Sequence, residues 1–473
     1  MRVLLINPGM DFSKFGSFKR YMQPMPPIGL AYLAAALKKE GLDFKVIDDF
    51  ADRVGIRGII DLLKDYPADI VGISCLTPSA LYVLQIADAV RQYNKKIKII
   101  LGNIHASIFY ESILRQGLVD VIVHGEGELT FPEVVNALAQ KKELRTIPGI
   151  SFMLEGKVIK TEERAPLGEI DYLSYPAWEY FPVKKYGFLP FMDIAKPALS
   201  VLASRGCAYK CSYCSLVYMN NHYRQRDPLR VVDEIEYLVD KFNVKQVGFV
   251  DPIFPLYKKS GIAFSTEMIK RGLNKKLVWI CETRVDSVDK ELLGFMKEAG
   301  CKRILYGIES GNQETLDGVN KDTSLDLIRK NISDTRKLKI EATGLFMIGF
   351  PQETRPMMED TIKLARELDL DFAKFAITIP FPGSELYVKL TQAGKLRRQD
   401  WDNFVTFNPD PKKLVSINEH VSARDLIALQ RRAHREFYLR PRLIWRHLFQ
   451  IKSIKKMDML NSLVSFVFHG RLN

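Results

Sequence analysis

The chain has 473 residues, of which 47% are hydrophobic and 26% are charged, as in globular proteins with more than one core. No apolar stretch approaches the roughly 20 residues that a membrane-spanning helix needs, and the first apolar run is too short for a secretion signal. We therefore expect a cytoplasmic protein. Residues 431–473 contain ten Lys or Arg and two Asp or Glu, so much of the net charge of +13 lies there. This distribution argues against a nucleic-acid groove along the whole protein and predicts one basic C-terminal patch.

The first 140 residues alternate strands with helical patterns. The strands are expected at 3–7, 44–47, 69–74, 97–101 and 119–124, with helices at 28–39, 55–64 and 79–93. Each strand is a nearly continuous apolar run, which is typical of a parallel sheet covered by helices on both faces. We predict a doubly wound, five-stranded parallel sheet, whose ligands would bind at the carboxyl ends of the strands. No G-x-G-x-x-G follows the first strand, so a dinucleotide fingerprint is absent.

Residues 141–196 interrupt this alternation. Strand-like runs at 150–154 and 157–161 flank Glu155-Gly156 and predict a hairpin within a proline-rich linker. Six further strands are expected at 199–203, 246–250, 278–281, 304–307, 343–348 and 374–379. Six βα units are too few for a closed eightfold barrel and predict a partial (β/α)6 barrel over residues 197–395. Residues 396–473 are expected to form a basic helical segment.

Three cysteines stand close together after the first strand of the second domain. The segment SRGCAYKCSYC, residues 204–214, places Cys207, Cys211 and Cys214 at C-x3-C-x2-C spacing. A cytoplasmic protein keeps its thiols reduced, so metal binding is a better explanation than disulfides. Clusters with four irons normally take four thiolates, and three cysteines leave one iron open. The alternative is a structural zinc site, with His222 as the fourth ligand, although C-x3-C is an unusual half-site for zinc.

This spacing, in a loop between a strand and a helix, resembles the radical S-adenosylmethionine (SAM) superfamily. The resemblance implies a [4Fe–4S] cluster whose open iron chelates the amino and carboxylate groups of SAM. One electron then cleaves SAM, and the resulting 5′-deoxyadenosyl radical abstracts a hydrogen atom from the substrate. An electron donor such as flavodoxin or ferredoxin is implied as a partner. The protein's part is to position these groups in a dry cavity.

The same resemblance assigns roles at the ends of successive barrel strands. Tyr213 matches an aromatic position near the adenine, with a purely packing role as the equal alternative. Asp251 ends the second strand, where the family contacts the SAM amino group. Arg284 follows the third strand and could pair with the SAM carboxylate through a bidentate contact. Glu309, followed by Ser310, ends the fourth strand and is placed to accept from the ribose hydroxyls.

The N-terminal sheet resembles the cobalamin-binding domain that is fused to many radical SAM enzymes. The matching segments are PPIGLAYL at 26–33, GNIH at 102–105 and HGEGE at 124–128. In that family a corrin lies over the strand ends and faces the barrel. The resemblance therefore implies cobalamin as a further cofactor. The residues expected near it are Pro27, Gly29, Ser74, Thr77, Gly102, His105, Glu126 and Gly127.

Two departures from the family pattern concern the axial ligand of cobalamin. The D-x-H-x-x-G motif is missing after the first strand; His124-x-x-Gly127 mimics its tail, but Ile122 stands where Asp is needed. Asn103 replaces the second glycine of the fourth-strand loop. We therefore expect base-off cobalamin without a histidine from that motif. His105 is either an axial ligand or, more simply, a loop histidine bonded to backbone, and some members with this architecture hold no corrin.

Three functions fit these features. The first is cobalamin-dependent methylation of an unactivated carbon, and the second is radical ring formation, C–C coupling or rearrangement without methyl transfer. The third, from another class, is a cobalamin- or SAM-responsive binding protein, which the intact cysteine loop disfavours. RNA modification is a further rival, but no accessory RNA-binding barrel is visible after the core. The substrate is therefore expected to be a small molecule or a lipid.

The C-terminal segment interleaves aromatic and basic residues over 437–449, and a short apolar run follows at 460–468. Such composition fits a helix lying in a membrane interface, with Arg and Lys toward anionic headgroups. It would place the enzyme peripherally on the inner membrane face and favour a lipid or isoprenoid substrate. The alternative is a helix packed along the open side of the barrel.

Overall fold

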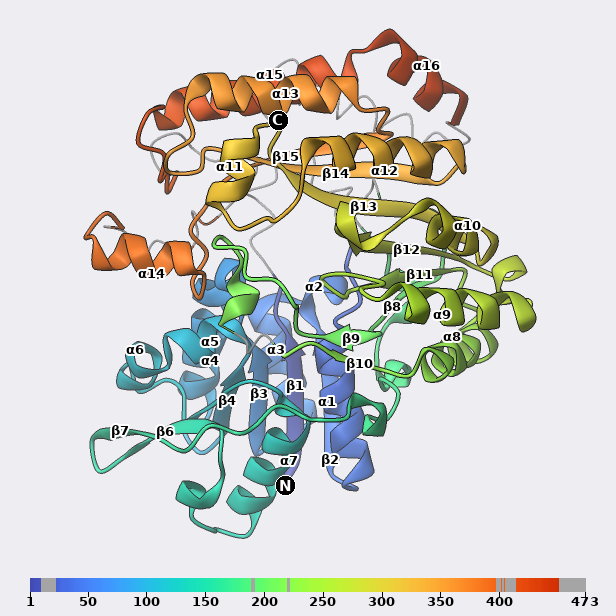
Figure 1. Cartoon of the computed structure of the whole chain (residues 1–473). Coiled ribbons are helices and arrows are strands. Elements are labelled where there is room, and N and C mark those ends of the chain that lie inside the picture. The colour runs from blue at the N-terminus through green and yellow to red at the C-terminus, as the bar shows by residue number, and fades with distance from the viewer. Residues whose placement is uncertain are drawn as a thin grey trace. The chain divides into compact units, whose positions relative to one another are not determined.

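The computed structural model describes residues 1–9, 23–188, 192–218, 222–396, 401, 404 and 414–450. The chain divides into two compact units: the first contains described residues 1–9 and 24–186, and the second contains Gln23 and the described residues from Gly187 onward. Figure 1 shows the helices and strands of both units. Among the described residues, no helix is both long and apolar enough to cross a membrane.

The first unit is built on one seven-stranded sheet in the order β2-β1-β3-β4-β5-β6-β7. The predicted five strands are all present and parallel, and the strands are β1 (Arg2–Asn7), β2 (Asp43–Asp48), β3 (Ile70–Ser74), β4 (Lys98–Gly102) and β5 (Val121–Val123). Val3, Leu4, Leu5 and Ile6 of β1 are at most 1% exposed, as expected for a central strand covered on both faces. The doubly wound fold predicted from the apolar runs is confirmed.

Helices cover this sheet on both faces. On one face the core joins the strands to α3 (Gly55–Asp65), α4 (Ala80–Tyr93), α5 (Ile104–Ile108) and α6 (Tyr110–Arg115). α1 (Ile28–Lys39) and α7 (Gly127–Ala139) pack against each other, and the short α2 (Asp49–Asp52) follows β2 directly. In Figure 1 strands β1, β3 and β4 run side by side between these helices.

The predicted linker does not stand apart from the sheet. Its hairpin forms β6 (Ile150–Leu154) and β7 (Lys157–Lys160), and β6 pairs antiparallel with β5, so the hairpin extends the sheet. The first unit then continues to Tyr186, whose buried hydroxyl donates to Asp48 at the end of β2 over 2.6 Å. The compact unit thus ends at Tyr186, within residues 141–196, which the sequence predicts as a linker with a hairpin.

The second unit contains the six parallel strands expected for a partial barrel. Their order is β15-β14-β13-β12-β11-β8, and β8 and β15 remain edge strands among the described residues, so the barrel is open. The strands are β8 (Ala198–Val201), β11 (Gln246–Phe249), β12 (Val278–Thr283), β13 (Cys301–Glu309), β14 (Glu341–Ile348) and β15 (Phe372–Ile377). The helices between them are α8 (Pro228–Phe242), α9 (Lys258–Lys270), α10 (Lys290–Glu298), α11 (Gln313–Gly318), α12 (Leu325–Lys337) and α13 (Arg355–Glu367).

One end of the barrel interior is filled by an aromatic side chain. Phe188 packs with Ala198 of β8 and Ile280 of β12, and all three are at most 1% exposed. A Cβ atom built on Gly248 of β11 would lie 2.4 Å from the Phe188 ring. The missing side chain at Gly248 therefore makes the room that Phe188 occupies.

The C-terminal helices lie against the open edge of the barrel. After α14 (Glu385–Gln392), α15 (Ala423–Tyr438) packs along β15, and α16 (Pro441–Gln450) follows. The Tyr438 hydroxyl donates to Ala373 O over 2.9 Å, and Gln430 donates to Phe375 O over 2.8 Å. Side chains of α15 thus bond the backbone of an edge strand, which protects that edge. Over its described part, the basic segment is a helix packed along the barrel, which was the alternative expectation.

Candidate active site

The cysteine loop begins after a two-residue strand, β9 (Ser204–Arg205), which pairs antiparallel with β10 (Arg224–Gln225). Gly206 follows β9 with a φ of +81°, and a Cβ atom built there would lie 2.4 Å from the backbone oxygen of His222. Only glycine suits both this dihedral angle and this space. The pairing of β9 with β10 and the close contact at Gly206 therefore fix the position at which the cysteine loop begins. The side chain of His222, the alternative zinc ligand, is exposed.

The three cysteines lie on this loop, with Cys211 buried and Cys207 and Cys214 partly buried. Burial raises the pKa of the Cys207 thiol, and the positive charges of Arg284 and Lys321 lower it. Nearby cations favour the thiolate, the form that binds iron. Among the described residues, no three Cys, His, Asp or Glu side chains form a group shaped to hold a single metal ion. In a cubane cluster, by contrast, each thiolate binds its own iron.

Arg284 directly follows β12, and its side chain contacts the cysteine loop at Cys211. Its Nε and Nη2 donate to the two carboxylate oxygens of Asp286, each over 2.8 Å, and Nη1 lies 3.9 Å from Cys211 Sγ. Nη2 also donates to the backbone oxygen of Lys321, and the guanidinium carbon lies 3.7 Å from the ring centre of Tyr209. The bidentate side of Arg284 is thus already used by Asp286. Nη1 is the donor that Asp286 does not use, and the bidentate contact of Arg284 with the SAM carboxylate stays a prediction.

Glu309 ends β13 beside a second buried cation. Its Oε1 lies 2.8 Å from Lys321 Nζ, and both side chains are nearly buried. Glu309 has a φ of +64°, which is uncommon for a residue other than glycine and is often found at functional sites. Gly307 provides the space, because a Cβ atom there would lie 2.8 Å from Glu309 Oε1. The contact of Glu309 with ribose hydroxyls remains a prediction.

Tyr213 lies between the loop and the strand ends. Burial raises its pKa well above the ordinary value, and hydrogen bonds to Glu309 and Cys211 act in the same direction. Its ring centre is 5.6 Å from that of Phe350. Phe350 is held by Glu353, which accepts from the Gly349 and Phe350 amides over 2.6 and 3.2 Å. Tyr213 therefore packs in the protein, and its adenine contact stays a prediction.

Asp251 and Ser310 have buried side chains that support the strand ends. Asp251 accepts from the Ala203 amide over 3.0 Å and from the Ser204 hydroxyl, and burial raises its pKa to about 6. The Ser310 hydroxyl is fully buried against Thr361 of α13, at 3.1 Å. Both side chains therefore support the strand ends within the protein, and their contacts with SAM stay a prediction.

At the ends of β3, β4 and β5 the edge of the first unit has mainly small or apolar residues, whereas β2 ends at the buried Asp48. A Cβ atom on Gly102 would have no neighbour closer than 3.8 Å, and one on Gly125 would meet none within 4 Å. Leu76, after β3, is 47% exposed. Asn103 has a φ of +79° and donates to Ser74 Oγ over 3.1 Å, so it replaces glycine in a conformation that glycine favours. This open, mostly uncharged edge fits a large flat ligand such as a corrin.

His105 lies inside the first unit. It is 3% exposed, its Nδ1 is 3.2 Å from Thr77 Oγ1, and its ring packs on Phe109 with 4.7 Å between centres. Burial lowers its pKa to about 4. His105 and Thr77 therefore contact each other inside the first unit, and their contacts with cobalamin stay a prediction. His124 bonds Ser151 at 2.8 Å, consistent with a chance likeness to the missing motif.

The remaining predicted corrin contacts lie at helix starts. Pro27 precedes α1, and Gly29 in its first turn is exposed with open space around it. Glu126 precedes α7 and accepts from the Leu167 amide over 2.8 Å, whereas a Cβ atom on Gly127 would lie 3.0 Å from Leu33. Gly29 is therefore free to meet a ligand, and Glu126 and Gly127 also serve packing within the unit.

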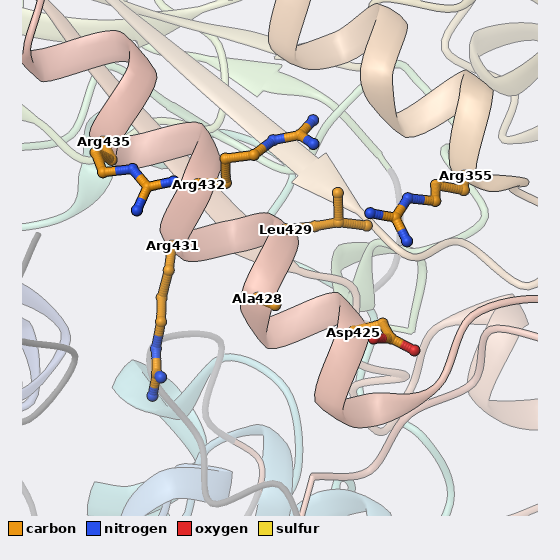
Figure 2. Close-up of a pocket in the computed structure, with 7 residues that line it drawn as sticks. All are labelled: Arg355, Asp425, Ala428, Leu429, Arg431, Arg432 and Arg435. Carbon is orange, nitrogen blue, oxygen red and sulfur yellow. The ribbon is translucent and has the colours of Figure 1, made fainter.

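A surface cavity of about 370 Å³ is lined by Arg355 of α13 and by residues of α15, and none of its lining residues belongs to the cysteine loop. Figure 2 shows Leu429 and Arg432 on the side of α15 that faces Arg355 of α13, whereas Arg431 points away. Arg432 forms ion pairs with Glu359 and Glu436, so much of the positive charge is balanced. The cavity is a feature of helix packing rather than part of the site.

Comparison with known proteins agrees with this geometry. Residues 20–135 match the B12 binding domain model, and residues 201–365 match the Radical SAM superfamily model. An uncharacterized methyltransferase from Pyrococcus horikoshii is 31% identical over 453 residues, which cover 95% of each chain. The chain belongs to the cobalamin-binding radical SAM family.

A further relative and a solved structure show the reactions and the fold to which this chain is similar. The anaerobic magnesium-protoporphyrin IX monomethyl ester cyclase of Cereibacter sphaeroides is 31% identical over 88% of this chain and 68% of the relative. The radical SAM methyltransferase TsrM from Kitasatospora setae, solved with cobalamin and a [4Fe–4S] cluster, has a TM-score of 0.68. Its 19% identity covers 84% of this chain and 76% of TsrM, so the likeness supports the fold.

Membership of this family makes the chain a radical SAM enzyme, with a [4Fe–4S] cluster, SAM and cobalamin as its cofactors. Cys207, Cys211 and Cys214 would hold the cluster, and the edge at Gly102 and Gly125 would hold the corrin. The sequence motifs did not single out Asp286, Lys321 or Glu353. Asp286 could have been noticed because it stands two residues after Arg284. Lys321 and Glu353 come near the other site residues only through the fold, so no nearby motif pointed to them.

Proposed function

We propose that this enzyme transfers a methyl group from SAM to an unactivated carbon of a small-molecule substrate. The observation that carries the proposal is the three-cysteine loop, held by Arg284 at the strand ends of a partial barrel, in a chain that also has a cobalamin-binding domain. A relative named a methyltransferase aligns over nearly the whole chain. The chemistry of unactivated carbons calls for a radical, which such a loop is suited to generate.

The residues of the barrel have distinct tasks in this reaction. When bound, the cluster supplies the electron that cleaves SAM, and cobalamin carries the methyl group. Arg284 and Lys321 place positive charge beside the cysteine loop, which stabilises thiolate ligands. Glu309 and Tyr213 lie next to the cysteines and can hold the nucleoside of SAM. Phe188 packs with Ala198 of β8 and Ile280 of β12, which fills space in the barrel that water could otherwise take.

The direct test is a product analysis. We would reconstitute the enzyme anaerobically with iron, sulfide and hydroxocobalamin, and add a reductant and SAM with a deuterated methyl group. Methyl transfer through two SAM molecules predicts that S-adenosylhomocysteine and 5′-deoxyadenosine form together in the presence of substrate. 5′-Deoxyadenosine with no S-adenosylhomocysteine would reject methyl transfer.

The second candidate is radical chemistry without methyl transfer. The cyclase relative from Cereibacter sphaeroides favours it, since that protein is as similar to this chain as the named methyltransferase. The same experiment separates the two candidates, because the cyclase-type reaction would consume SAM without producing S-adenosylhomocysteine. Formation of neither product would leave a cobalamin- or SAM-responsive binding protein.

We also propose a reducing partner and a membrane contact. A flavodoxin or ferredoxin would supply the electron, as the chain itself offers one cysteine loop of this kind. For the membrane, Trp445 and Ile444 of α16 are 62% and 39% exposed beside the exposed Arg442. Arg446, in contrast, is bound to Asp369 and Asp371 over 2.7 and 3.1 Å and belongs to the barrel. The predicted apolar run at 460–468 lies outside the described residues.

Liposome flotation tests the membrane contact. A truncation before Arg431, which the composition suggests, would cut through α15 and remove Phe437, which packs on Phe375 of β15, so the structure moves the cut to after Gln450. The full chain should float with anionic vesicles and less so at high salt, because charges are screened within about 10 Å at 0.1 M. Trp445→Ser should weaken flotation. Equal flotation of the full chain, the truncation and this variant would reject the contact.

A further inference from the structure

The cysteine loop is held by other elements in its second half and is exposed in its first half. The Ser212 amide donates to Val319 O over 3.1 Å, and the Ser212 oxygen accepts from the Leu386 amide over 2.9 Å. In the first half, by contrast, Ala208 and Lys210 are exposed. A second molecule can therefore approach the loop from the side on which it begins.

Strand β10 lies directly against that beginning. A Cβ atom built on Gly206, the residue before Cys207, would lie 3.2 Å from the amide nitrogen of Tyr223. The Tyr223 ring meets the Tyr257 ring edge to face, with 5.5 Å between the ring centres, and Tyr257 is 56% exposed. A chain of contacts thus runs from the protein surface at Tyr257, through Tyr223, to the residue beside a cluster ligand.

The segments around these contacts carry mostly positive charge. Residues 204–214, 222–230 and 257–260 contain seven Lys or Arg and one Asp, whereas the whole chain has 69 Lys or Arg against 56 Asp or Glu. Nearby acids balance two of the seven cations, and these ion pairs are Lys258 with Asp289 and Glu291, and Arg226 with Glu234. Positive charge therefore remains in excess beside the cysteine loop.

The other cations gather on the hairpin and on the two helix starts beside it. Arg205 and Arg224 are aligned across the β9–β10 pair, so the hairpin places two cations side by side. Arg230 in the first turn of α8 and Lys259 in the first turn of α9 are exposed. A side-chain hydrogen bond from Gln225 of β10 joins the hairpin to the first turn of α9. We call the surface formed by β9, β10, Tyr257 and these two helix starts the hairpin face.

The position of the hairpin face suits the delivery of an electron. The cysteines outside the loop stand at positions 75, 281 and 301, so the sequence contains no second motif of this kind to relay electrons. A protein donor must then dock beside the loop itself. Electron-transfer proteins form small, transient interfaces, and complementary charge speeds their association. The exposed Tyr257 and Leu229, which is 46% exposed, add the apolar area that a docking surface needs.

We propose that the hairpin face docks a small acidic electron-transfer protein that reduces the cluster. The donor gives one electron to the cluster and is itself oxidised by one electron, and no atom is exchanged. The inference rests on the proposed function for the use of this electron, but it concerns the surface through which the electron arrives. The direct contact with the cysteine loop favours such a donor over an anionic membrane, which the experiment also tests.

The experiment uses the full, anaerobically reconstituted enzyme and compares two ways of reducing it. An acidic flavodoxin, kept reduced by NADPH and its reductase, has to dock, whereas dithionite reduces the cluster without docking. An acidic ferredoxin with its own reductase is assayed in the same way. The rate of 5′-deoxyadenosine formation gives the KM for each donor, and surface plasmon resonance gives the Kd without turnover. We expect at least one donor to bind saturably and more weakly at high salt.

Variants tie this binding to the hairpin face. Arg230→Glu with Lys259→Glu should raise the Kd and KM of the donor about tenfold or more at low salt, because the charge that attracts it is reversed. Tyr257→Ser should raise the Kd about tenfold, since tyrosines often dominate docking surfaces. The rate with dithionite should not change in either variant. Lys275→Glu with Lys276→Glu makes the same charge change at exposed lysines before β12 and should bind the donor normally. Iron content and melting temperature verify that each variant is folded.

The outcomes separate this inference from the proposed function. If dithionite yields no 5′-deoxyadenosine with the natural enzyme, the proposed function fails, whereas weaker donor binding by the hairpin-face variants would still support the docking surface. Equal donor binding by the two double variants, binding of neither donor, or equal loss of the dithionite and donor rates would overturn the inference. Loss of binding to anionic vesicles, with donor binding intact, would assign the hairpin face to a membrane instead.

Discussion

The two strand-end edges of the molecule are built in opposite ways. The edge of the first unit offers glycine at 102 and 125 and an exposed Leu76, with few charges. The edge of the barrel is crowded with buried charge: Arg284 on Asp286, and Lys321 on Glu309. An open edge with few charges around β3 and β4 suits a large ligand held over its whole area. A crowded, charged edge suits a small cluster whose ligands must be held in place.

The largest effect is expected when a cysteine of the loop at the barrel edge is replaced. Changing Cys207, Cys211 or Cys214 to Ala should abolish formation of 5′-deoxyadenosine and reduce the iron bound, from about four per chain in the natural enzyme. Iron analysis and chromatography of the products measure both. Cys75→Ala and Cys301→Ala, at buried cysteines outside the loop, serve as controls and should keep the activity. Activity in any variant of the trio would contradict the assignment.

A smaller effect is expected at the support of the cluster. Arg284→Gln removes the bidentate contact with Asp286 and the cation beside Cys211, so cluster retention should fall about 10- to 100-fold, as at other outer-shell positions. Iron retained after gel filtration in the presence of a chelator measures it. Arg271→Gln breaks a comparable ion-pair group on the outer helices and should not change iron retention. Equal loss in both variants would mean general destabilisation.

The first unit and the second unit each contain a buried histidine, His105 and His434, and the pH dependence of stability tests the burial of both. Burial lowers the pKa of His105 and His434 to about 4, below the 6.5 of the unfolded chain. Between these values the unfolded state binds more protons, so stability falls as the pH drops. For each histidine the loss at pH 5 relative to neutral pH is about 2 kcal/mol. Urea unfolding should show a flatter pH profile for His434→Gln, and an unchanged one for His420→Gln, which alters an exposed side chain.

The open edge predicts a weaker but selective effect. Gly102→Leu would place a side chain where the corrin is expected, so hydroxocobalamin should bind about tenfold more weakly, as judged by a spectrophotometric titration. Formation of 5′-deoxyadenosine should persist, because the cysteine loop is untouched. Gly102→Ala has room for its Cβ atom and should bind normally. If Gly102→Leu bound cobalamin normally, the corrin would have to lie elsewhere.

The smallest effect concerns the EPR spectrum of bound cobalamin, in which we expect no signal from an axial histidine. Because His105 is buried and bonded to Thr77, the EPR spectrum of the cob(II)alamin form should show no nitrogen splitting from an axial histidine. His105→Leu should leave the spectrum unchanged. Splitting that disappears in this variant would show that His105 leaves its packed position to bind cobalt.

Most of the strands and the cysteine loop could be predicted from the sequence, because each depends on a local pattern of residues. Apolar runs located all eleven parallel strands, and the cysteine spacing located the loop. The extent of the first compact unit and the partners of several side chains could not be predicted, because they depend on contacts between distant residues. The Tyr186–Asp48 bond joins residues 138 positions apart, and the Arg284–Cys211 contact joins residues 73 apart. A motif shows that Ser310 ends a strand, but only the fold shows that its hydroxyl faces α13.

Phe188 has a consequence for the stability of the barrel. Its ring occupies the space that the missing side chain of Gly248 leaves, against Ala198 and Ile280. Phe188→Ala would leave a cavity there, and should lower the free energy of unfolding by about 3–5 kcal/mol.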